Sequence, residues 1–296
     1  MEFVGHGAFG IITKAAWLPY FGVFGIPATL AWRLMPVVGT SDICFGILTL
    51  FCPVRIVLLY MTAWGLITAC LRPLPGEPMW ELIERAANFG VSLAYLLLAG
   101  PSRNLKEWIR PIKAPQLTSI TAERISWVLR ATVALLLIGH GGFGIASIHK
   151  QAWSSYFSIL GMHDASTLVG WFEIALGVLV FVYPATGLLL FIFAWKVFTE
   201  SLRLPVGERV WEFIERGGSY AAPMALLFVR NCASSLNTSP RHTIGALSRN
   251  RRSRWMRART RDVSGSSAWP DVDPSRGWRG GWVTYLPRLM KAGVDE

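Results

Sequence analysis

The residues of this chain best suited to chemistry occur twice, at matching positions in two parts of the sequence. Each set contains one histidine, three carboxylates and two arginines: His6, Asp42, Arg72, Glu81, Glu84 and Arg85 in the first, and His140, Glu173, Arg203, Glu212, Glu215 and Arg216 in the second. Carboxylates beside arginine or histidine can exchange protons or bind a polar ligand. The same groups can instead pair with one another and hold helices together, so both interpretations stay open.

These residues lie in a duplicated module. Residues 76–85 read GEPMWELIER and residues 207–216 read GERVWEFIER. A Gly-His-Gly-x-Phe-Gly motif likewise occurs at 5–10 and again at 139–144. Because repeated segments of this length mark repeated structural units, we predict two copies of one module.

The composition predicts an integral membrane protein. The chain is 52% hydrophobic and 16% charged, with a mean hydropathy of +0.40. A soluble domain of this size is much less apolar. The net charge of +11 is concentrated outside the apolar runs, so we expect contact with the lipid bilayer and no binding of nucleic acid.

Apolar runs of about 20 residues, long enough to cross a bilayer, predict the helices. In the second copy they lie near 125–147, 166–183, 185–203 and 209–229, and in the first near 36–52, 54–71 and 79–100. The first copy has few apolar residues before its histidine motif, and we expect its first helix to be truncated. The predicted fold is therefore all-α, a polytopic membrane protein of two fused four-helix transmembrane bundles.

The predicted organisation has four parts. They are a first membrane module at 1–100, a basic linker at 101–124, a second membrane module at 125–230 and a basic, disordered tail at 231–296. Modules with an even number of helices form a parallel repeat, which places the linker and the tail on one side of the membrane. The positive-inside rule makes that side cytoplasmic, in a bacterial inner (plasma) membrane. The repeated polar residues then gather at the extracytoplasmic helix ends.

The fourth helix of the first copy has a polar face formed by Glu77, Glu81, Glu84, Arg85 and Asn88. Its spacing predicts ion pairs from Glu81 to Arg85 and from Glu84 to Arg72. One interpretation is that these pairs only close the bundle. The other is a site at headgroup depth for a polar ligand or for proton transfer.

Each histidine motif is followed by a carboxylate on the next helix, Asp42 after His6 and Glu173 after His140. The flanking glycines allow helices to approach closely, so a hydrogen bond between histidine and carboxylate is favoured over metal ligation. Haem is disfavoured because a second histidine ligand would have to come from the other copy. We predict no metal site.

The remaining aromatic and thiol residues are assigned structural roles. Repeated aromatic side chains fit a belt at the membrane interface: Trp17, Tyr20 and Phe21, with Trp153, Tyr156 and Phe157. The cysteines include no Cys-x-x-Cys motif, and we expect Cys44 and Cys70 to be ordinary packing residues.

The arrangement of motifs resembles the DoxX-like family of four-helix membrane proteins, in two tandem copies. The resemblance rests on the Gly-His-Gly-x-Phe-Gly motif, on Gly170, Glu173 and Gly177, and on the segment 199–223, and it spans nearly all of residues 5–230. It implies small four-helix bundles linked to quinone or thiol redox partners, including subunits of thiosulfate-to-quinone or terminal oxidase systems. The first copy departs from the pattern at 86–90, so we expect any site to be better preserved in the second copy.

From this resemblance we predict a redox-associated membrane subunit that binds a quinone or a redox partner protein at the polar cluster. In this hypothesis Glu84 or Glu215, oriented by Arg85 or Arg216, exchanges protons. A small-solute transporter or permeation path between the modules is one alternative. A structural or assembly module without catalysis is another, and the sequence leaves open whether the protein is an enzyme.

Overall fold

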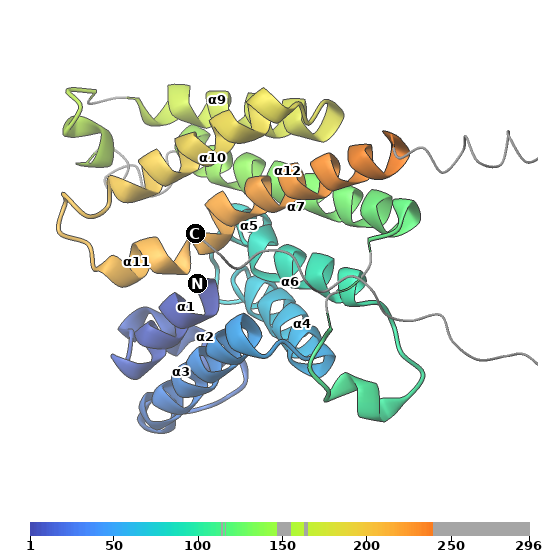
Figure 1. The fold of residues 1–296 in the computed structure, drawn as a ribbon. Helices are drawn as coiled ribbons and strands as arrows, with labels where there is room; N and C mark the ends of the chain where they lie inside the picture. The colour runs from blue at the N-terminus through green and yellow to red at the C-terminus, as the bar shows by residue number, and fades with distance from the viewer. Residues whose placement is uncertain (114, 116, 147–154, 163–164, 239–296) are drawn as a thin grey trace, which may run out of the picture. The chain divides into compact units, whose positions relative to one another are not determined.

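The computed structural model describes residues 1–113, 115, 117–146, 155–162 and 165–238, and these residues fold as helices joined by short connections (Figure 1). The first half contains α1 (Glu2–Ile11), η1 (Ala15–Trp17), α2 (Leu18–Val23), α3 (Ala28–Phe51), α4 (Arg55–Leu71), α5 (Met79–Glu84) and α6 (Ala86–Ala99). The second half contains α7 (Ser119–Ile145), α9 (Ser166–Val182), α10 (Thr186–Ser201), α11 (Val210–Glu215) and α12 (Gly217–Thr238), after the connector helix η2 (Leu105–Trp108).

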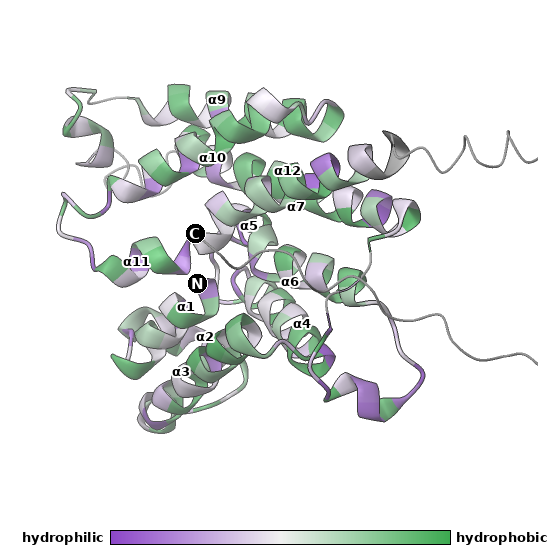
Figure 2. Ribbon diagram, viewed as in Figure 1, coloured by the Kyte–Doolittle hydropathy of each residue, from purple (hydrophilic) through white to green (hydrophobic). Residues whose placement is uncertain are grey.

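The lengths and composition of the helices fit an integral membrane protein. Within the described part of the chain, three helical stretches are long and apolar enough to cross a membrane, namely Ala28–Phe51, Met79–Ala99 and Ser119–Ile145. Figure 2 shows hydrophobic colour over much of α3, α9 and α10, and hydrophilic colour around η2. Large apolar side chains such as Leu50 and Phe51 are 74% and 79% exposed, as expected where lipid replaces water.

The predicted spans agree with the helices except at their ends and in the fourth helix of each copy, which the structure divides into two. Helix α3 begins at Ala28 instead of near 36, because Pro36 is accommodated inside the helix. Helix α12 continues to Thr238, past the predicted start of the tail, and residues 239–296 lie outside the described residues. Helix α1 has 10 residues where its counterpart α7 has 27.

The glycines of the histidine motif allow each first helix to pack closely on the second helix of its own copy. A Cβ atom added at Gly7 would lie 2.4 Å from the Gly39 carbonyl oxygen, and one at Gly141 would lie 2.4 Å from the Gly170 carbonyl oxygen. Real Cβ atoms do not approach backbone oxygens this closely. Both copies therefore use glycine at this helix crossing, which brings each histidine beside the carboxylate of the second helix.

The fourth helix of each copy is interrupted at an arginine. Helix α5 ends at Glu84 and α6 begins at Ala86, while α11 ends at Glu215 and α12 begins at Gly217. Both short helices contact the first helix of the other copy, α5 against α7 and α11 against α1 (Figure 1). The two copies of the sequence are thus interleaved at this point.

Glycine again explains why the interrupted helices fit there. A Cβ atom at Gly139 would lie 2.2 Å from the Glu84 backbone nitrogen, and one at Gly5 would lie 2.3 Å from the Glu215 backbone nitrogen. In both copies, the first glycine of the histidine motif thus contacts the backbone of the other copy. This contact places Glu84, Arg85, Glu215 and Arg216 at the junction between the copies.

The connector after α6 is attached to the start of α4. The Arg55 guanidinium donates to the backbone carbonyls of Ala99 and Gly100, at 2.8 and 3.0 Å, and to that of Glu107 at 3.0 Å. Carbonyls at a helix C-terminus have no partner within the helix, so a cation there is stabilising. Arg55 therefore attaches the C-terminal end of α6 to the N-terminal end of α4. This contact lies at the opposite end of α6 from the polar junction.

Candidate functional site

The histidine of each motif pairs with a carboxylate of the next long helix. His6 Nδ1 lies 2.8 Å from Asp42 Oδ2, and His140 Nδ1 hydrogen-bonds Glu173 Oε2. Both carboxylates are fully buried. The predicted histidine-carboxylate hydrogen bond is confirmed in both copies. A carboxylate that accepts from Nδ1 leaves Nε2 as the ring nitrogen that can take up a proton.

A second group also occurs in both copies and joins tyrosine, arginine and glutamate. Tyr20 donates its hydroxyl to Glu77, and Arg72 donates to the Tyr20 oxygen and lies 3.5 Å from Glu77. The sequence suggested that Tyr20 belongs to an interfacial aromatic belt. Its hydroxyl joins the polar residues of the site, and its place at the membrane interface stays a prediction.

The corresponding group of the second copy consists of Tyr156, Arg203 and Glu208. Tyr156 donates to Glu208, and Arg203 NH1 lies 3.1 Å from the Tyr156 oxygen and 3.2 Å from Glu208 Oε2. Burial raises the pKa of the Tyr156 phenol to about 12, and its hydrogen bond to Glu208 acts in the same direction, against the charge of Arg203. The phenol therefore stays a hydrogen-bond donor at neutral pH.

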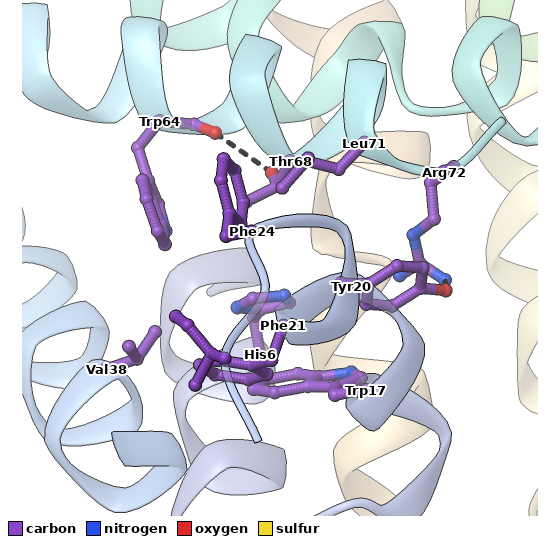
Figure 3. A pocket seen from close by; sticks show the side chains of 11 residues that line it. His6, Trp17, Tyr20, Phe21, Phe24, Val38, Trp64, Thr68, Leu71 and Arg72 are labelled. Atoms are coloured by element: carbon purple, nitrogen blue, oxygen red, sulfur yellow. Dashed lines mark hydrogen bonds between the residues drawn. The ribbon is translucent and has the colours of Figure 1, made fainter. Parts of the chain in front are cut away.

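An apolar cavity of about 250 Å³ opens between these two groups in the first copy, and we call it the first-copy cavity. Its walls come from α1, η1, α2, the segment between α2 and α3, the middle of α3, and α4. They include His6, Trp17, Tyr20, Phe24, Trp64 and Arg72 (Figure 3). Trp17 is buried and stacks on the His6 ring, with centroids 4.5 Å apart. It therefore supports the histidine and does not lie in an interfacial belt as predicted.

Two buried polar atoms beside the first-copy cavity have no partner within the described part of the chain. They are the indole nitrogen of Trp64, which lines the cavity, and the second carboxylate oxygen of Asp42. In the second copy the matching groups bond to each other, with Trp195 Nε1 donating to Glu173 Oε1 at 2.9 Å. Asp42 is one methylene shorter than Glu173. That difference explains why the Glu173 carboxylate hydrogen-bonds both His140 and Trp195, whereas the Asp42 carboxylate hydrogen-bonds only His6.

The second copy places further charged side chains beside its histidine. Lys196 is fully buried, and its Nζ lies 3.1 Å from His140 Nδ1, 3.4 Å from Glu173 and 3.1 Å from Glu200. The positions that match Lys196 and Glu200 in the first copy are Gly65 and Ala69. The counterpart cavity, lined by His140, Tyr156, Glu173 and Arg203 among others, has a volume of only about 10 Å³. Among the residues that the structure describes, the larger cavity thus lies in the first copy, although the sequence favoured the second.

The junction between the copies contains the remaining predicted residues. Arg216 pairs with Glu84 and lies 3.4 Å from Glu200, so the predicted pair of Glu84 with Arg72 is wrong. The cause is the interleaving of the copies, which brings Glu84 beside α11 and α12 while Arg72 turns to Glu77. The predicted pair of Glu81 with Arg85 is confirmed, at 3.4 Å.

A polar cavity of about 300 Å³ lies at this junction, and we call it the inter-copy cavity. Its lining includes four cations, Lys14, Arg85, Arg203 and Arg216, and four carboxylates, Glu81, Glu84, Glu208 and Glu212. Lys14 lies 2.9 Å from Glu212, which ties the end of α1 to α11. The twelve predicted residues therefore form one histidine-centred group in each copy and a charged group between them.

Three residues of the site, Glu208, Lys196 and Glu200, were missed from the sequence, whereas Glu77 was placed on the predicted polar face. Glu208 is the counterpart of Glu77, so the repeat itself pointed to it. Lys196 and Glu200 are not repeated, and a search for repeated polar residues passes over them. The only signal for these two was their charge inside an otherwise apolar helix, α10, where a charge is costly and marks either a buried partner or a cavity.

Within the described ranges, no three His, Cys, Asp or Glu residues gather closely enough to hold a metal ion, and all four cysteines are free thiols. The predicted counterpart of Trp17 in the second copy, Trp153, lies outside the described residues. Comparisons with protein families, with curated proteins and with solved structures give no match to this chain.

Proposed function

We propose that this protein is a membrane subunit of a redox system and that its first copy binds the ring of a quinone-class molecule. The observation that supports this most is the first-copy cavity, which places aromatic walls beside a histidine-aspartate pair. The resemblance of the sequence to DoxX-like proteins, which are linked to quinones, favours the same ligand class.

The shape of the first-copy cavity suits a flat, largely apolar ring. Sites for whole drug-sized ligands have volumes of about 300–1,000 Å³, so a cavity of about 250 Å³ suits a head group and not a long tail. Phe24 lines this cavity and is 62% exposed, which places the cavity mouth at the protein surface. A ring can enter there while an isoprenoid tail stays among lipids.

The polar atoms of the cavity suit the oxygens of such a ring. With Nδ1 bound to Asp42, the His6 Nε2 lone pair can accept the proton of a quinol hydroxyl, and the resulting imidazolium is stabilised by the Asp42 carboxylate. The unpaired Trp64 indole is a donor for a quinone carbonyl. A buried polar group left unpaired costs about 1–3 kcal/mol, so a ligand oxygen that satisfies it gains affinity.

The topology proposed for this function follows the sequence. Two four-helix modules, related as a parallel repeat, cross a bacterial inner membrane with the linker and the tail in the cytoplasm. The first-copy cavity then faces the extracytoplasmic half of the bilayer. Electrons would pass between the bound ring and a redox partner protein, while the residues of this chain hold the ring and move its protons.

The test is a binding measurement with two tryptophan substitutions on adjacent residues of α3. Val38 lines the first-copy cavity, and Val37 is 61% exposed. In nanodiscs, the wild-type protein and the Val37→Trp variant should bind a short-tailed quinone with similar affinity. Val38→Trp should weaken binding by about tenfold or more, equivalent to at least about 1.4 kcal/mol. Equal affinity of a folded Val38→Trp variant and the wild-type protein would refute the assignment.

The inter-copy cavity supports one alternative function, a path for small polar solutes between the modules. Its lining is charged and its volume is about 300 Å³, which is large enough for several waters. Uptake of a small zwitterion into proteoliposomes, compared with protein-free liposomes, would reveal such transport. A purely structural module is less well supported, because cavities open beside the ion pairs.

A further inference from the structure

Glu2 occupies a distinctive place between the cavities of this protein. It lies one helical turn before His6 on α1, so both side chains lie on one face of the helix. Its Oε1 atom is buried and has no hydrogen-bond partner among the residues that the structure describes. A buried polar atom without a partner is costly, so the position of this oxygen calls for a reason beyond packing.

Two small cavities meet at Glu2. One, the junction cavity, has a volume of about 20 Å³ and is lined by Glu2 together with Glu84, Arg85, Glu215 and Arg216. The other, the connecting cavity, has a volume of about 10 Å³ and is lined by Glu2, His6, Trp64, Thr68 and Asn88 among others. A polar space of roughly 10–15 Å³ is about the minimum that holds one water molecule.

Each of these cavities shares lining residues with the next, so they form a series. The inter-copy cavity shares Glu84, Arg85 and Arg216 with the junction cavity. The junction cavity shares Glu2 and Asn88 with the connecting cavity. The connecting cavity in turn shares His6, Trp64 and Thr68 with the first-copy cavity. Polar side chains therefore lie at every step from the charged junction to His6.

The second copy lacks this arrangement. Aligning its histidine motif with that of the first copy places Leu136 at the position of Glu2, and Leu136 also lines the junction cavity. The other residues of the junction cavity come in matched pairs, such as Glu84 with Glu215 and Arg85 with Arg216. The carboxylate thus occurs only on the side that leads to the larger cavity.

We propose that Glu2 is a proton-relay residue that connects His6 to the inter-copy cavity through single waters in the two small cavities. This deepens the proposed function, since protons taken up by His6 from a bound ring need a route to water. The Glu2 carboxylic acid gives its proton to the water on one side and regains one from the water on the other. Together the two transfers move one proton past Glu2 and return its carboxylic acid to the protonated form.

The charges around Glu2 suit such a relay. The junction cavity brings two carboxylates, Glu84 and Glu215, and two guanidiniums, Arg85 and Arg216, to its walls, and His6 lies on the opposite side of Glu2. The guanidiniums lower the free energy of the Glu2 anion and the neighbouring carboxylates raise it, so the two effects oppose each other. Neither state is therefore strongly excluded, as a relay requires.

The relay can be tested without any quinone. In nanodiscs with ¹⁵N-labelled histidine, the exchange of the His6 imidazole proton with water is measured by NMR, and His6→Gln identifies the signal. Glu2→Gln should slow this exchange by at least about tenfold, because a positioned proton-transfer group typically contributes about 10²–10⁴-fold. Glu2→Asp should restore most of the rate.

The control is Glu107→Gln, because Glu107 lies on the connector helix η2, pairs with the exposed Arg110 and lines none of these cavities. It should leave the exchange rate within about twofold of wild type, well below the contribution of a positioned proton-transfer group. Equal rates in Glu2→Gln and wild type, or an equal slowing in Glu107→Gln, would overturn the relay. Failure of quinone to bind, with exchange slowed only in Glu2→Gln, would refute the proposed ligand and leave the relay standing.

Discussion

The two copies place equivalent histidine, carboxylate, tyrosine and arginine residues around corresponding cavities, but the two cavities differ in size. In the first copy it is an apolar cavity of about 250 Å³, and in the second it has closed to about 10 Å³. The residues that differ are few. Gly65 and Ala69 in the first copy correspond to Lys196 and Glu200 in the second, and Asp42 corresponds to Glu173.

In our proposal, the first copy binds the ligand and the second copy stabilises the fold. In the second copy Lys196 binds the acidic groups that a ligand would otherwise approach, and Glu200 links it to Arg203 at 2.9 Å and Arg216 at 3.4 Å. That network reaches Glu84 of the first copy through Arg216. The second copy therefore fixes the junction on which the open copy depends.

Lys196→Met should have the largest effect on stability. It leaves Glu173 and Glu200 buried with too little positive charge, and breaking a buried pair by removing one partner costs about 3–5 kcal/mol. The free energy of unfolding in mixed micelles measures this loss. Lys14→Met is the matched control, because its pair with Glu212 is partly exposed and such pairs contribute about 0–1 kcal/mol. Similar losses in both variants would mean that the second copy is not held by its buried charges.

Substituting the glycines at the junction should have the next largest effect. Gly5→Ala and Gly139→Ala each push a methyl group against the backbone of Glu215 or Glu84, and overpacking of this kind costs about 1–3 kcal/mol. The two losses should be similar, since the contact is the same in both halves. Gly187→Ala on α10, where a Cβ would meet nothing within 4 Å, should be neutral or stabilising. A loss in only one of the two junction variants would contradict the interleaved arrangement.

Exchanging the two carboxylates should sharpen the comparison of the cavities. Asp42→Glu lengthens the side chain so that it can reach the Trp64 indole, as Glu173 reaches Trp195. The expected result is a gain of about 1 kcal/mol in stability, typical of one hydrogen bond, together with weaker quinone binding.

The reciprocal change, Glu173→Asp, should lower stability by a similar amount, about 1 kcal/mol, and leave quinone affinity unchanged. Both quantities come from unfolding and binding curves of the same preparations. Weaker binding in Glu173→Asp alone would place the ligand in the second copy.

The smallest effect concerns pH. The pKa of Tyr156 is raised to about 12 by burial, whereas a tyrosine in the unfolded chain titrates near about 10. A raised pKa means that the contribution of the phenol to stability is present below pH about 10 and is lost as the pH rises toward about 12. The difference in unfolding free energy between wild type and Tyr156→Phe should shrink over that range. A constant difference would show that the Tyr156 phenol is not protected.

Much of the fold could be predicted from the sequence because lipid imposes a simple length rule on apolar helices. The duplicated motifs also predicted that His6 meets Asp42 and that His140 meets Glu173. These contacts follow from helix order within one copy, which the repeat makes visible. The same reasoning correctly paired Glu81 with Arg85, four residues apart on one helical face.

The junction could not be predicted in this way. Pairing Glu84 with Arg216 requires knowing that α5 and α11 contact the first helix of the opposite copy, and the interruptions at Arg85 and Arg216 involve no proline. The open cavity was also hidden, because most of the residues that line it have identical counterparts in the second copy, among them His6, Tyr20, Trp64 and Arg72. The repeat therefore gives no sign that the two cavities differ in size.

A photoreactive short-tailed quinone, cross-linked to the protein in nanodiscs and mapped by mass spectrometry, tests most directly which copy binds the ligand. The structure predicts labelling around the first-copy cavity, on residues such as Tyr20, Phe24 and Trp64, that unlabelled quinone suppresses. Labelling around Val169 and Thr199 in the second copy, or labelling that competitor does not reduce, would contradict the division between an open, ligand-binding copy and a closed, charge-filled one.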